Sequence, residues 1–473
     1  MSEPRVAIVG GGISGLATAY FLGRQGADSV LIEKSSRLGG LIRTDRWEDC
    51  LLEAGADSYL AAKPAVTELA RELPALAEQI IGSNDAARRI FVVRDSKLIA
   101  MPRGMVMMVP ADLSSAIGSP LFSAKTKLGF LTETLSRPRS RPGDFSVGEL
   151  IADHFGSELL DYAADPLLAG VYGGHSAKLS APSVLPRFVA YERDYGSLIR
   201  AVRRERRVPP ASGLFLSFRN GMQSLVDAVR AAAGSRTRVL HAEARSVEYE
   251  AGAWRIDCGQ ETIRAHDLVL ACPAYSAARL LENAAPSLAS ELALIPYSSA
   301  ILVTLVYDRA ALAHPLNGFG FLVPRTERRT IAAATWVSTK FPSRTPPDRA
   351  AVRAFIVAEN ATQLLGAPEQ QIIDLVRSDL ARFMEIEAAP RFSSVQAWPE
   401  SMPQYVVGHQ QRLINIAAAA AQIRGLHLAG NAYDGVGIPD CVRLAKETAK
   451  RIVEAPGPRT SARQSERRGG HDS

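Results

Sequence analysis

The sequence predicts a composite α/β (α+β) fold, in which a discontinuous Rossmann-like domain is combined with a strand-rich domain and a helical insertion. Three observations support this fold class. The chain opens with an apolar run that leads into a glycine-rich turn, strand-like segments recur at 239–272 and 300–337, and the last helix, expected over Pro439–Val453, has one apolar side. With 473 residues, of which 47% are hydrophobic and 22% charged, the chain has room for about two to four domains.

The first glycine-rich turn lies in a βαβ context. Arg5–Val9 is expected to form a buried strand, Ser14–Arg24 a helix and Val30–Glu33 a second strand. Between the first strand and the helix, Gly10–Gly15 satisfies the dinucleotide fingerprint G-x-G-x-x-G. A lone fingerprint is weak evidence, but the strand before it and the helix after it supply the context that dinucleotide binding requires.

Each glycine of this fingerprint has a physical role. Gly10 permits the tight turn, Gly12 lets the backbone approach a pyrophosphate, and Gly15 lets helix and strand pack closely. At the start of the helix, the N–H groups of Ile13 and Ser14 and the positive end of the helix dipole face the phosphates. We therefore predict that these residues bind a dinucleotide.

A carboxylate and a second glycine pair follow the second strand. Glu33 lies 18 residues after Gly15, where a carboxylate can accept hydrogen bonds from an adenosine ribose. The segment Arg37–Gly40, followed by Arg43-Thr44 and Glu53–Ala56, resembles the GG-doublet signature of the amine-oxidase-like flavoprotein superfamily. In that family the second glycine pair packs beside the cofactor phosphates and the flavin, which implies FAD as the cofactor. The residues implied as contacts here are Glu33, Lys34, Arg37, Gly39, Gly40 and Arg43.

The far end of the chain resembles the C-terminal FAD motif of the same family. Gly425–Asn431 is expected to form a strand that ends at a glycine, and Gly435–Asp440 opens the last helix. The resemblance implies that the start of this helix points at the pyrimidine edge of the flavin, where its dipole stabilises the negative charge of reduced flavin. It also implies that a strand over Leu240–Val247 reaches FAD through its backbone. The implied contacts are Val247, Gly430, Gly437 and Ile438.

Further segments resemble the protoporphyrinogen and coproporphyrinogen oxidases, in a likeness that runs from about residue 5 to residue 453. They are Asp165–Gly174, Phe218–Leu225, Gly318–Pro324 with the later Phe341-Pro342, and Trp398–Tyr405 continuing to Gly408-His409. The sequence departs from the family at three places: Asp165 replaces a glutamate, Gly173–His175 replaces Ala-Gly-Asp, and Phe355–Ala358 lacks a Gly-Gly pair. The resemblance therefore defines the substrate pocket less well than the cofactor site.

This resemblance implies an FAD-dependent six-electron oxidation of a porphyrinogen, either coproporphyrinogen III or protoporphyrinogen IX, in heme biosynthesis. FAD accepts two electrons at a time, so about three cycles are needed, with O2 as acceptor and H2O2 as product. Because the flavin and the macrocycle carry the chemistry, no residue is assigned as catalytic, and a core or surface role is expected for His175 and His409. Arg89, beside Arg88 on a hairpin expected over 89–101, is the candidate cation for a substrate propionate.

The motif positions also predict the domain boundaries. A discontinuous FAD-binding domain is expected at 1–80, 214–285 and 405–455, a substrate-binding domain at 81–100 and 286–404, and a helical domain at 101–213. The polar residues 456–473 are expected to form a disordered tail.

Composition argues against several other classes of protein. The formal charge of +6 is too small to indicate nucleic-acid binding, no signal peptide is visible, and no apolar stretch is long enough to span a membrane. The four cysteines form no C-x-x-C pair, so we expect no metal site and buried thiols in a reducing, cytoplasmic compartment. Covalently flavinylated amine oxidases carry a cysteine shortly before their C-terminal Trp motif. No cysteine lies between Ser393 and Gln404 in this sequence, so FAD is expected to be non-covalent.

Alternatives stay open on location and function. Arg103–Arg141 carries six cations and two anions beside apolar residues, a pattern typical of an interfacial segment on the anionic inner face of a membrane. The alternative is that its apolar residues line the core or the substrate pocket. A homodimer also stays open. The rival functions are a flavin amine oxidase or carotenoid desaturase-like oxidoreductase, and a non-catalytic flavin-binding assembly factor.

Overall fold

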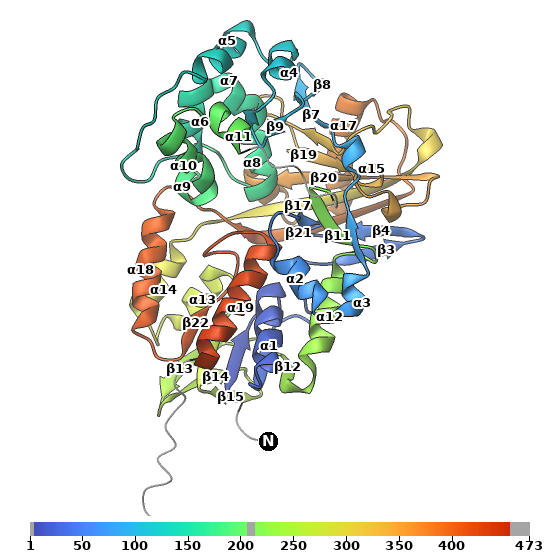
Figure 1. Cartoon of the computed structure of the whole chain (residues 1–473). Coiled ribbons are helices and arrows are strands. Elements are labelled where there is room, and N and C mark those ends of the chain that lie inside the picture. Colours follow the sequence, from blue (N-terminus) through green and yellow to red (C-terminus); the bar gives the residue numbers. More distant parts are fainter. Residues whose placement is uncertain (1–3, 206–212, 455–473) are drawn as a thin grey trace, which may run out of the picture.

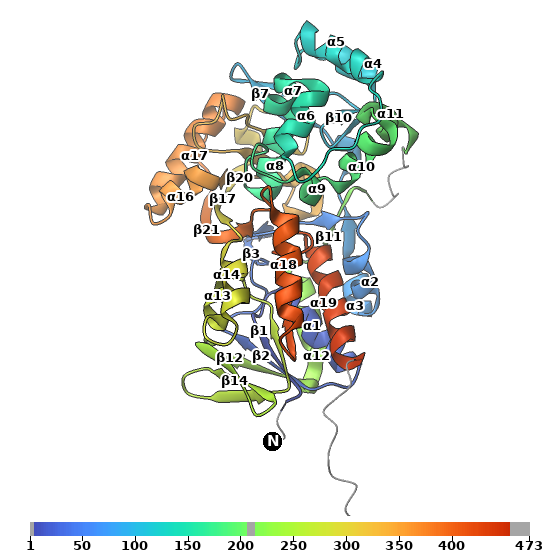
Figure 2. The ribbon, with the colours of Figure 1, turned by 90° about the vertical axis from the view of Figure 1, so that its left-hand side faces the viewer.

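The computed structural model describes residues 4–205 and 213–454. Figures 1 and 2 show a helical region at one end of the molecule, a parallel sheet with its covering helices at the other end, and a mixed sheet between them. The tail predicted for 456–473 lies outside the described residues. Among the described residues, no helix is both long and apolar enough to cross a membrane.

The N-terminal strand belongs to a five-stranded parallel sheet with the order β12-β2-β1-β16-β22. The strands are β1 Val6–Val9, β2 Ser29–Glu33, β12 Thr237–His241, β16 Asp267–Leu270 and β22 Leu426–Leu428. All four residues of β1 are buried, as the unbroken apolar run requires when both faces of a parallel sheet are covered. Because the strands come from three distant parts of the sequence, this region is discontinuous, as predicted.

Helices cover one face of this sheet, and a second layer covers the other. The first face packs against α1 Ile13–Arg24, α12 Gln223–Ala233 and α19 Ile438–Glu454, which Figure 1 shows side by side. The second layer consists of the antiparallel strands β13 Ser246–Glu250, β14 Ala253–Asp257 and β15 Thr262–Ala265 and the helices α13 Ala274–Leu281, α14 Pro286–Ala293 and α18 His409–Ala421. Two small helices, α2 Ala65–Arg71 and α3 Pro74–Ala77, lie beside α19 and α12.

The single strand predicted over Leu240–Val247 is wrong. Leu240 lies in β12, parallel to β2, whereas Val247 lies in β13, which pairs antiparallel with β14 in a different sheet. The change of sheet occurs over residues 242–245, where the Arg245 N–H already donates to the Asp257 carbonyl of β14 at 2.8 Å. The alternation of apolar residues continues through this turn, which explains why the sequence suggested one strand.

The mixed sheet has seven strands in the order β21-β17-β20-β19-β18-β7-β8. They are β7 Ile90–Arg94, β8 Lys97–Ala100, β17 Tyr297–Asp308, β18 Gly320–Leu322, β19 Ala333–Trp336, β20 Arg349–Val357 and β21 Phe392–Pro403. The predicted hairpin is present, with Asp95 and Ser96 at positive φ in its turn. The helix α17 Glu369–Met384 packs on the face that points away from the parallel sheet. Short pairs complete this part: β3 Thr44–Trp47 with β4 Cys50–Glu53, and β11 Phe215–Phe218 with β5 Tyr59–Leu60 and β6 Ile80–Gly82.

The helical region has its own hydrophobic core. Its elements are α4 Leu113–Gly118, α5 Ala124–Glu133, α6 Val147–Phe155, α7 Ser157–Leu159, a π-helical turn at Leu160–Ala164, α8 Asp165–Tyr172, α9 Ala181–Val184, α10 Pro186–Tyr195 and α11 Leu198–Arg204. A single helix over 147–163 is not observed, because Gly156 adopts a φ of +81° and ends α6. The helix α8 contacts β18 and β20, so this region caps the mixed sheet.

Candidate functional site

The fingerprint turn forms an open cradle at the start of α1. A Cβ atom on Gly10 would lie 2.5 Å from the Ala271 carbonyl oxygen, and one on Gly15 would lie 2.0 Å from the Gly10 oxygen, so both positions require glycine. A Cβ atom on Gly12 would meet nothing nearer than the Gly40 Cα at 4.0 Å. Within the described part of the chain, no side chain caps α1, so its first N–H groups, including those of Ile13 and Ser14, remain available to an anion.

The second glycine pair lies directly against this cradle. The Gly39 N–H donates to the Gly11 carbonyl at 2.8 Å, and Gly12 and Gly39 form an isolated parallel bridge. Gly40 has a φ of +56°, and a Cβ atom there would lie 3.2 Å from the Gly12 Cα. The structure therefore brings together two motifs that the sequence placed in the same site.

The polar residues predicted around these glycines have different positions. The Glu33 carboxylate, at the end of β2, accepts hydrogen bonds from the Gly11 N–H at 2.6 Å and from Ser35 at 2.8 Å. The Arg37 guanidinium donates to backbone carbonyls of the second glycine segment, those of Leu38, Gly40 and Ile42. Burial and the neighbouring Arg43 lower the Arg37 pKa. Lys34 is exposed, and Arg43 pairs with Asp45 at 2.8 Å and donates to Gln396 at 3.1 Å.

The C-terminal motif reaches the same edge of the parallel sheet. Gly430 follows β22, and a Cβ atom there would meet only the Cys272 carbonyl oxygen, at 4.0 Å. Because β1, β16 and β22 are parallel, their carboxyl ends share one edge, where α/β proteins bind ligands. At the start of α19, the Gly437 N–H donates to the Asp440 carboxylate at 3.2 Å, and Asp440 pairs with Lys63 at 2.7 Å.

These contacts refine the expectation for the last helix. The last helix, predicted over Pro439–Val453, runs from Ile438 to Glu454, and Asp440 places a negative charge in its first turn. The Asp440 carboxylate is stabilised both by the positive end of the helix dipole and by its ion pair with Lys63. The Val247 side chain is buried in the second layer, on the far face of the parallel sheet. The cofactor contact predicted for this residue would therefore be made by its backbone.

A face of the mixed sheet looks toward the two glycine segments. The Trp398 indole N–H donates to the Ala54 carbonyl at 2.7 Å, and the Arg353 guanidinium donates to the Gly55 carbonyl. Cross-strand registers place Leu322, Ala333, Phe355 and Leu302 in one row of this face, and Gly320, Thr335, Arg353 and Thr304 in the next. The first row is apolar, and the second combines small residues with the charged Arg353. Such a face suits a flat, largely apolar molecule that carries a few polar groups.

Buried charges join the sheet face to the segment around Gly55. Asp57 pairs with Lys340 at 3.0 Å and with Arg353 at 3.2 Å, and Glu53 pairs with Arg344 at 3.2 Å. Burial would raise the pKa of Asp57, but Lys340 and Arg353 outweigh it and hold that pKa well below its usual range. The sequence analysis missed these pairs because 283 positions separate Asp57 from Lys340 and no local pattern marks either.

The remaining predicted residues lie outside this arrangement. The Arg89 side chain is exposed, and its backbone carbonyl accepts the Phe319 N–H at 2.7 Å, beside the start of β18. His409 is 0% exposed and its ring stacks on Tyr405 with 4.1 Å between centroids. Burial and Arg412 lower the His409 pKa to about 4, in keeping with a neutral core residue. Within 4–205 and 213–454, no cluster of His, Cys, Asp and Glu side chains could hold a metal ion.

Known proteins share this architecture and sequence pattern. The profile of the family described as flavin containing amine oxidoreductase matches residues 13–453. The chain is 29% identical to the coproporphyrinogen III oxidase of Staphylococcus aureus, covering 95% of this chain and 98% of that protein. It is 28% identical to the chloroplastic protoporphyrinogen oxidase of Nicotiana tabacum, covering 94% and 85%. The crystal structure of a provisionally assigned protoporphyrinogen oxidase from Exiguobacterium sp. 255-15 superposes with a TM-score of 0.87 at 30% identity, covering 96% and 99%.

Proposed function

This chain belongs to the flavin-containing amine oxidoreductase family, and we propose that it is a porphyrinogen oxidase of heme biosynthesis that binds FAD non-covalently. The observation that carries the substrate class is likeness over nearly the whole length of relatives named coproporphyrinogen III oxidase and protoporphyrinogen oxidase. The geometry of the two adjoining glycine segments supports a dinucleotide, because Gly12 faces open space at an uncapped helix start.

The chain's own residues supply binding and orientation. The N–H groups at Ile13 and Ser14 would hold the pyrophosphate, and Glu33 would accept the adenosine ribose hydroxyls. FAD, when bound, accepts electrons from the substrate in pairs and passes them to O2, which gives H2O2. The row of Leu322, Phe355 and Leu302 would hold the macrocycle against the flavin and exclude water.

Cofactor binding is tested first, with a Gly12→Val variant. The branched side chain would occupy the space that the phosphates need, so we expect purified wild-type protein to be yellow and to release FAD on denaturation, while the variant loses most of its FAD. Gly129→Val is a matched control, because its position in α5 has open space and is remote from the cradle. Full FAD occupancy in the Gly12→Val variant would contradict the assignment.

Turnover is tested by supplying coproporphyrinogen III and protoporphyrinogen IX side by side in air. We expect about three H2O2 per porphyrin formed, since each flavin cycle removes two electrons. The ratio of the two rates decides which porphyrinogen is the substrate. Strict dependence on NAD(P)+ without oxygen uptake would contradict the proposal, and a yellow protein without turnover of either porphyrinogen would favour the amine oxidase, desaturase or assembly-factor alternatives.

A peripheral membrane contact is a separate proposal, and the structure narrows the residues that it involves. Of the apolar residues in 103–141, Met108, Leu121, Phe122 and Phe130 are buried in the helical core. An exposed apolar set remains, from 38% exposed at Ile117 to 77% at Leu135. Its members are Val106, Met107, Ile117, Leu128, Leu131 and Leu135. Together with exposed cations, this set resembles an interfacial surface.

The cations near this apolar set are not equivalent. Arg103, Lys125 and Arg137 are exposed and Lys127 is half-buried, whereas Arg139 and Arg141 bind Glu192 and Asp153 within the helical region. Electrostatic attraction to an anionic surface would therefore come from the first four residues. A homodimer remains a proposal without a supporting contact.

A further inference from the structure

Arg353 occupies an unusual position at the centre of β20. Its side chain is 2% exposed, its guanidinium lies over the Phe355 ring at 5.2 Å, and it donates to the Gly55 carbonyl while pairing with Asp57 at 3.2 Å. Within the part of the chain that the structure describes, the Arg353 Nε has no hydrogen-bond partner. Arg353 is therefore a buried cation with an unused donor on the face that carries the apolar row, a position from which it can serve a bound group.

The carbonyl that Arg353 binds belongs to a segment packed against the second glycine pair. A Cβ atom on Gly55 would lie 1.7 Å from the Leu41 carbonyl oxygen, so these two backbones are in close contact. The Ala54 N–H also donates to the Arg43 carbonyl at 2.9 Å. A continuous series of contacts therefore joins Arg353 to Gly55, Gly55 to Leu41, and the Gly39–Gly40 pair to the phosphate cradle.

The orientation of a dinucleotide follows from these contacts. Glu33 is placed to hold the adenosine half on the β2 side of Gly12. The flavin half then extends the other way, along Gly40 and Leu41 to Gly55, and reaches the sheet face where Arg353 lies.

The buried cluster of Lys340, Arg353 and Asp57 carries a net positive charge. Among the residues that the structure describes, Asp57 is the counter-charge of both Lys340 and Arg353, and Glu53 is paired with Arg344, so one positive charge is in excess. In a buried site such a charge is weakly screened. Reduced flavin carries more negative charge than oxidised flavin, so the cluster would favour the reduced form.

We propose that Arg353 is a positioning residue of the flavin site: it fixes Gly55 beneath the flavin ring, and with Lys340 it provides the positive charge that favours flavin reduction. This inference rests on the FAD binding proposed above. It assigns two separable roles to one side chain, a hydrogen bond that sets cofactor affinity and a charge that sets the reduction potential.

The test compares three Arg353 and Lys340 variants with a matched control. Arg353→Met removes the hydrogen bond and the charge, Arg353→Lys keeps the charge but loses the planar fork, and Lys340→Met removes charge without touching Gly55. Arg349→Met is the control, because Arg349 lies on the same strand but pairs with Asp308 and Asp348. The readouts are the FAD dissociation constant, the two-electron midpoint potential and the turnover number.

We expect the preference for reduced over oxidised flavin to fall about tenfold in Arg353→Met, which is about 30 mV for a two-electron couple. Lys340→Met should lower the potential with unchanged FAD affinity, Arg353→Lys should restore the potential but not the affinity, and Arg349→Met should match wild type. Wild-type potential and affinity in Arg353→Met would overturn the proposal, as would an equal change in the control. If Arg353→Met does not fold, an unchanged potential in Lys340→Met overturns the role of the charge. Absence of flavin from wild-type protein would instead refute the proposed function itself.

Discussion

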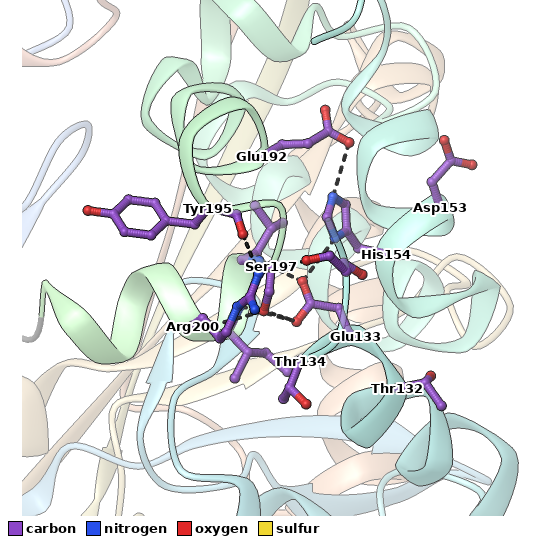
Figure 3. Close-up of polar contacts among 12 residues, drawn as sticks. Thr132, Glu133, Thr134, Asp153, His154, Glu192, Tyr195, Ser197 and Arg200 are labelled. Carbon is purple, nitrogen blue, oxygen red and sulfur yellow. Dashed lines mark hydrogen bonds and ion pairs between the residues drawn. The ribbon is translucent and has the colours of Figure 1, made fainter. Parts of the chain in front are cut away.

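Two clusters of buried charge lie in different parts of this molecule and are connected differently. In the helical region, His154 lies between two carboxylates, with Nδ1 2.9 Å from Glu133 and Nε2 3.1 Å from Glu192 (Figure 3). Glu133 also accepts hydrogen bonds from Ser197, Leu198 and Ile199 at the start of α11. Each ring nitrogen of His154 therefore lies within hydrogen-bond distance of a carboxylate oxygen.

In the second cluster, at the junction of the parallel and mixed sheets, fewer of the polar groups have a hydrogen-bond partner. Arg139 and Arg141 complete the coordination of Glu192 in the helical cluster, whereas the Arg353 Nε at the junction has no partner among the described residues. We infer that the helical cluster serves the packing of its own helices, while the junction cluster serves a bound cofactor. Glu133, His154 and Glu192 in the helical cluster are as buried as Glu53, Arg344 and Arg353 at the junction, so the satisfaction of these polar groups, not their burial, distinguishes the two.

The largest effect is expected from Arg344→Met at the junction. This change leaves the Glu53 carboxylate buried beside an apolar side chain, and removing one member of a buried pair costs about 3–5 kcal/mol. Glu53 also accepts the Met222 N–H at 2.9 Å, so α12 should loosen with it and FAD occupancy should fall. Urea unfolding and FAD content measure the two losses, and a stability loss with full FAD occupancy would separate this pair from the cofactor site.

A smaller loss is expected from Glu192→Gln in the helical region, about 2–3 kcal/mol, because His154 and two arginines lose their charged acceptor. The flavin potential should not change, since the cluster is confined to α5, α6, α10, α11 and the loop before α6. Asp194→Asn is the control, an exposed pair with Arg193 on the same helix that should leave unfolding unchanged. A shifted flavin potential in Glu192→Gln would contradict the separation of the two clusters.

Acid should weaken the helical cluster in a defined window. Burial would raise the Glu192 pKa, but Arg141 and Arg139 bring it down to about 2. A depressed folded-state pKa stabilises the protein above the unfolded value, near 4.3, and this contribution disappears as the pH falls toward 2. Wild-type protein should lose roughly 2 kcal/mol more than Glu192→Gln across that window, after allowance for solvent screening. Equal acid sensitivity of the two proteins would contradict the charged state assigned to Glu192.

The smallest effect concerns the surface of the helical region. Replacing Arg103, Lys125, Lys127 and Arg137 with Gln should abolish sedimentation with anionic liposomes at low salt, since each cation contributes about 1 kcal/mol of attraction. Arg139→Gln should have little influence on liposome binding, because Arg139 is held by Glu192. Equal loss in both variants, or sedimentation that is insensitive to salt, would contradict an electrostatic contact.

The sequence predicted the local parts of this architecture more successfully than the long-range parts. The strand–turn–helix around Gly10–Gly15, the hairpin after Arg89 and the last helix are each encoded within a few turns of chain, so periodicity and glycine positions sufficed. The strand over 240–247 was wrong because its apolar alternation continues through a change of sheet.

The two charge clusters could not be predicted in the same way. Arg353 and Asp57, like Glu133 and Glu192, meet only through tertiary packing, and each resembles an ordinary surface charge in the sequence. The propionate contact predicted for Arg89 stays a prediction, because its exposed side chain gives no geometry to support or oppose it.

Reduction of the bound flavin by substrate, followed without oxygen, tests the proposed function at its chemical step. Anaerobic mixing of the yellow wild-type protein with coproporphyrinogen III or protoporphyrinogen IX should bleach the flavin in a single fast phase, and admission of air should restore the colour with release of H2O2. Flavin that stays oxidised with both porphyrinogens, but is bleached by an amine or by NADPH, would contradict the account.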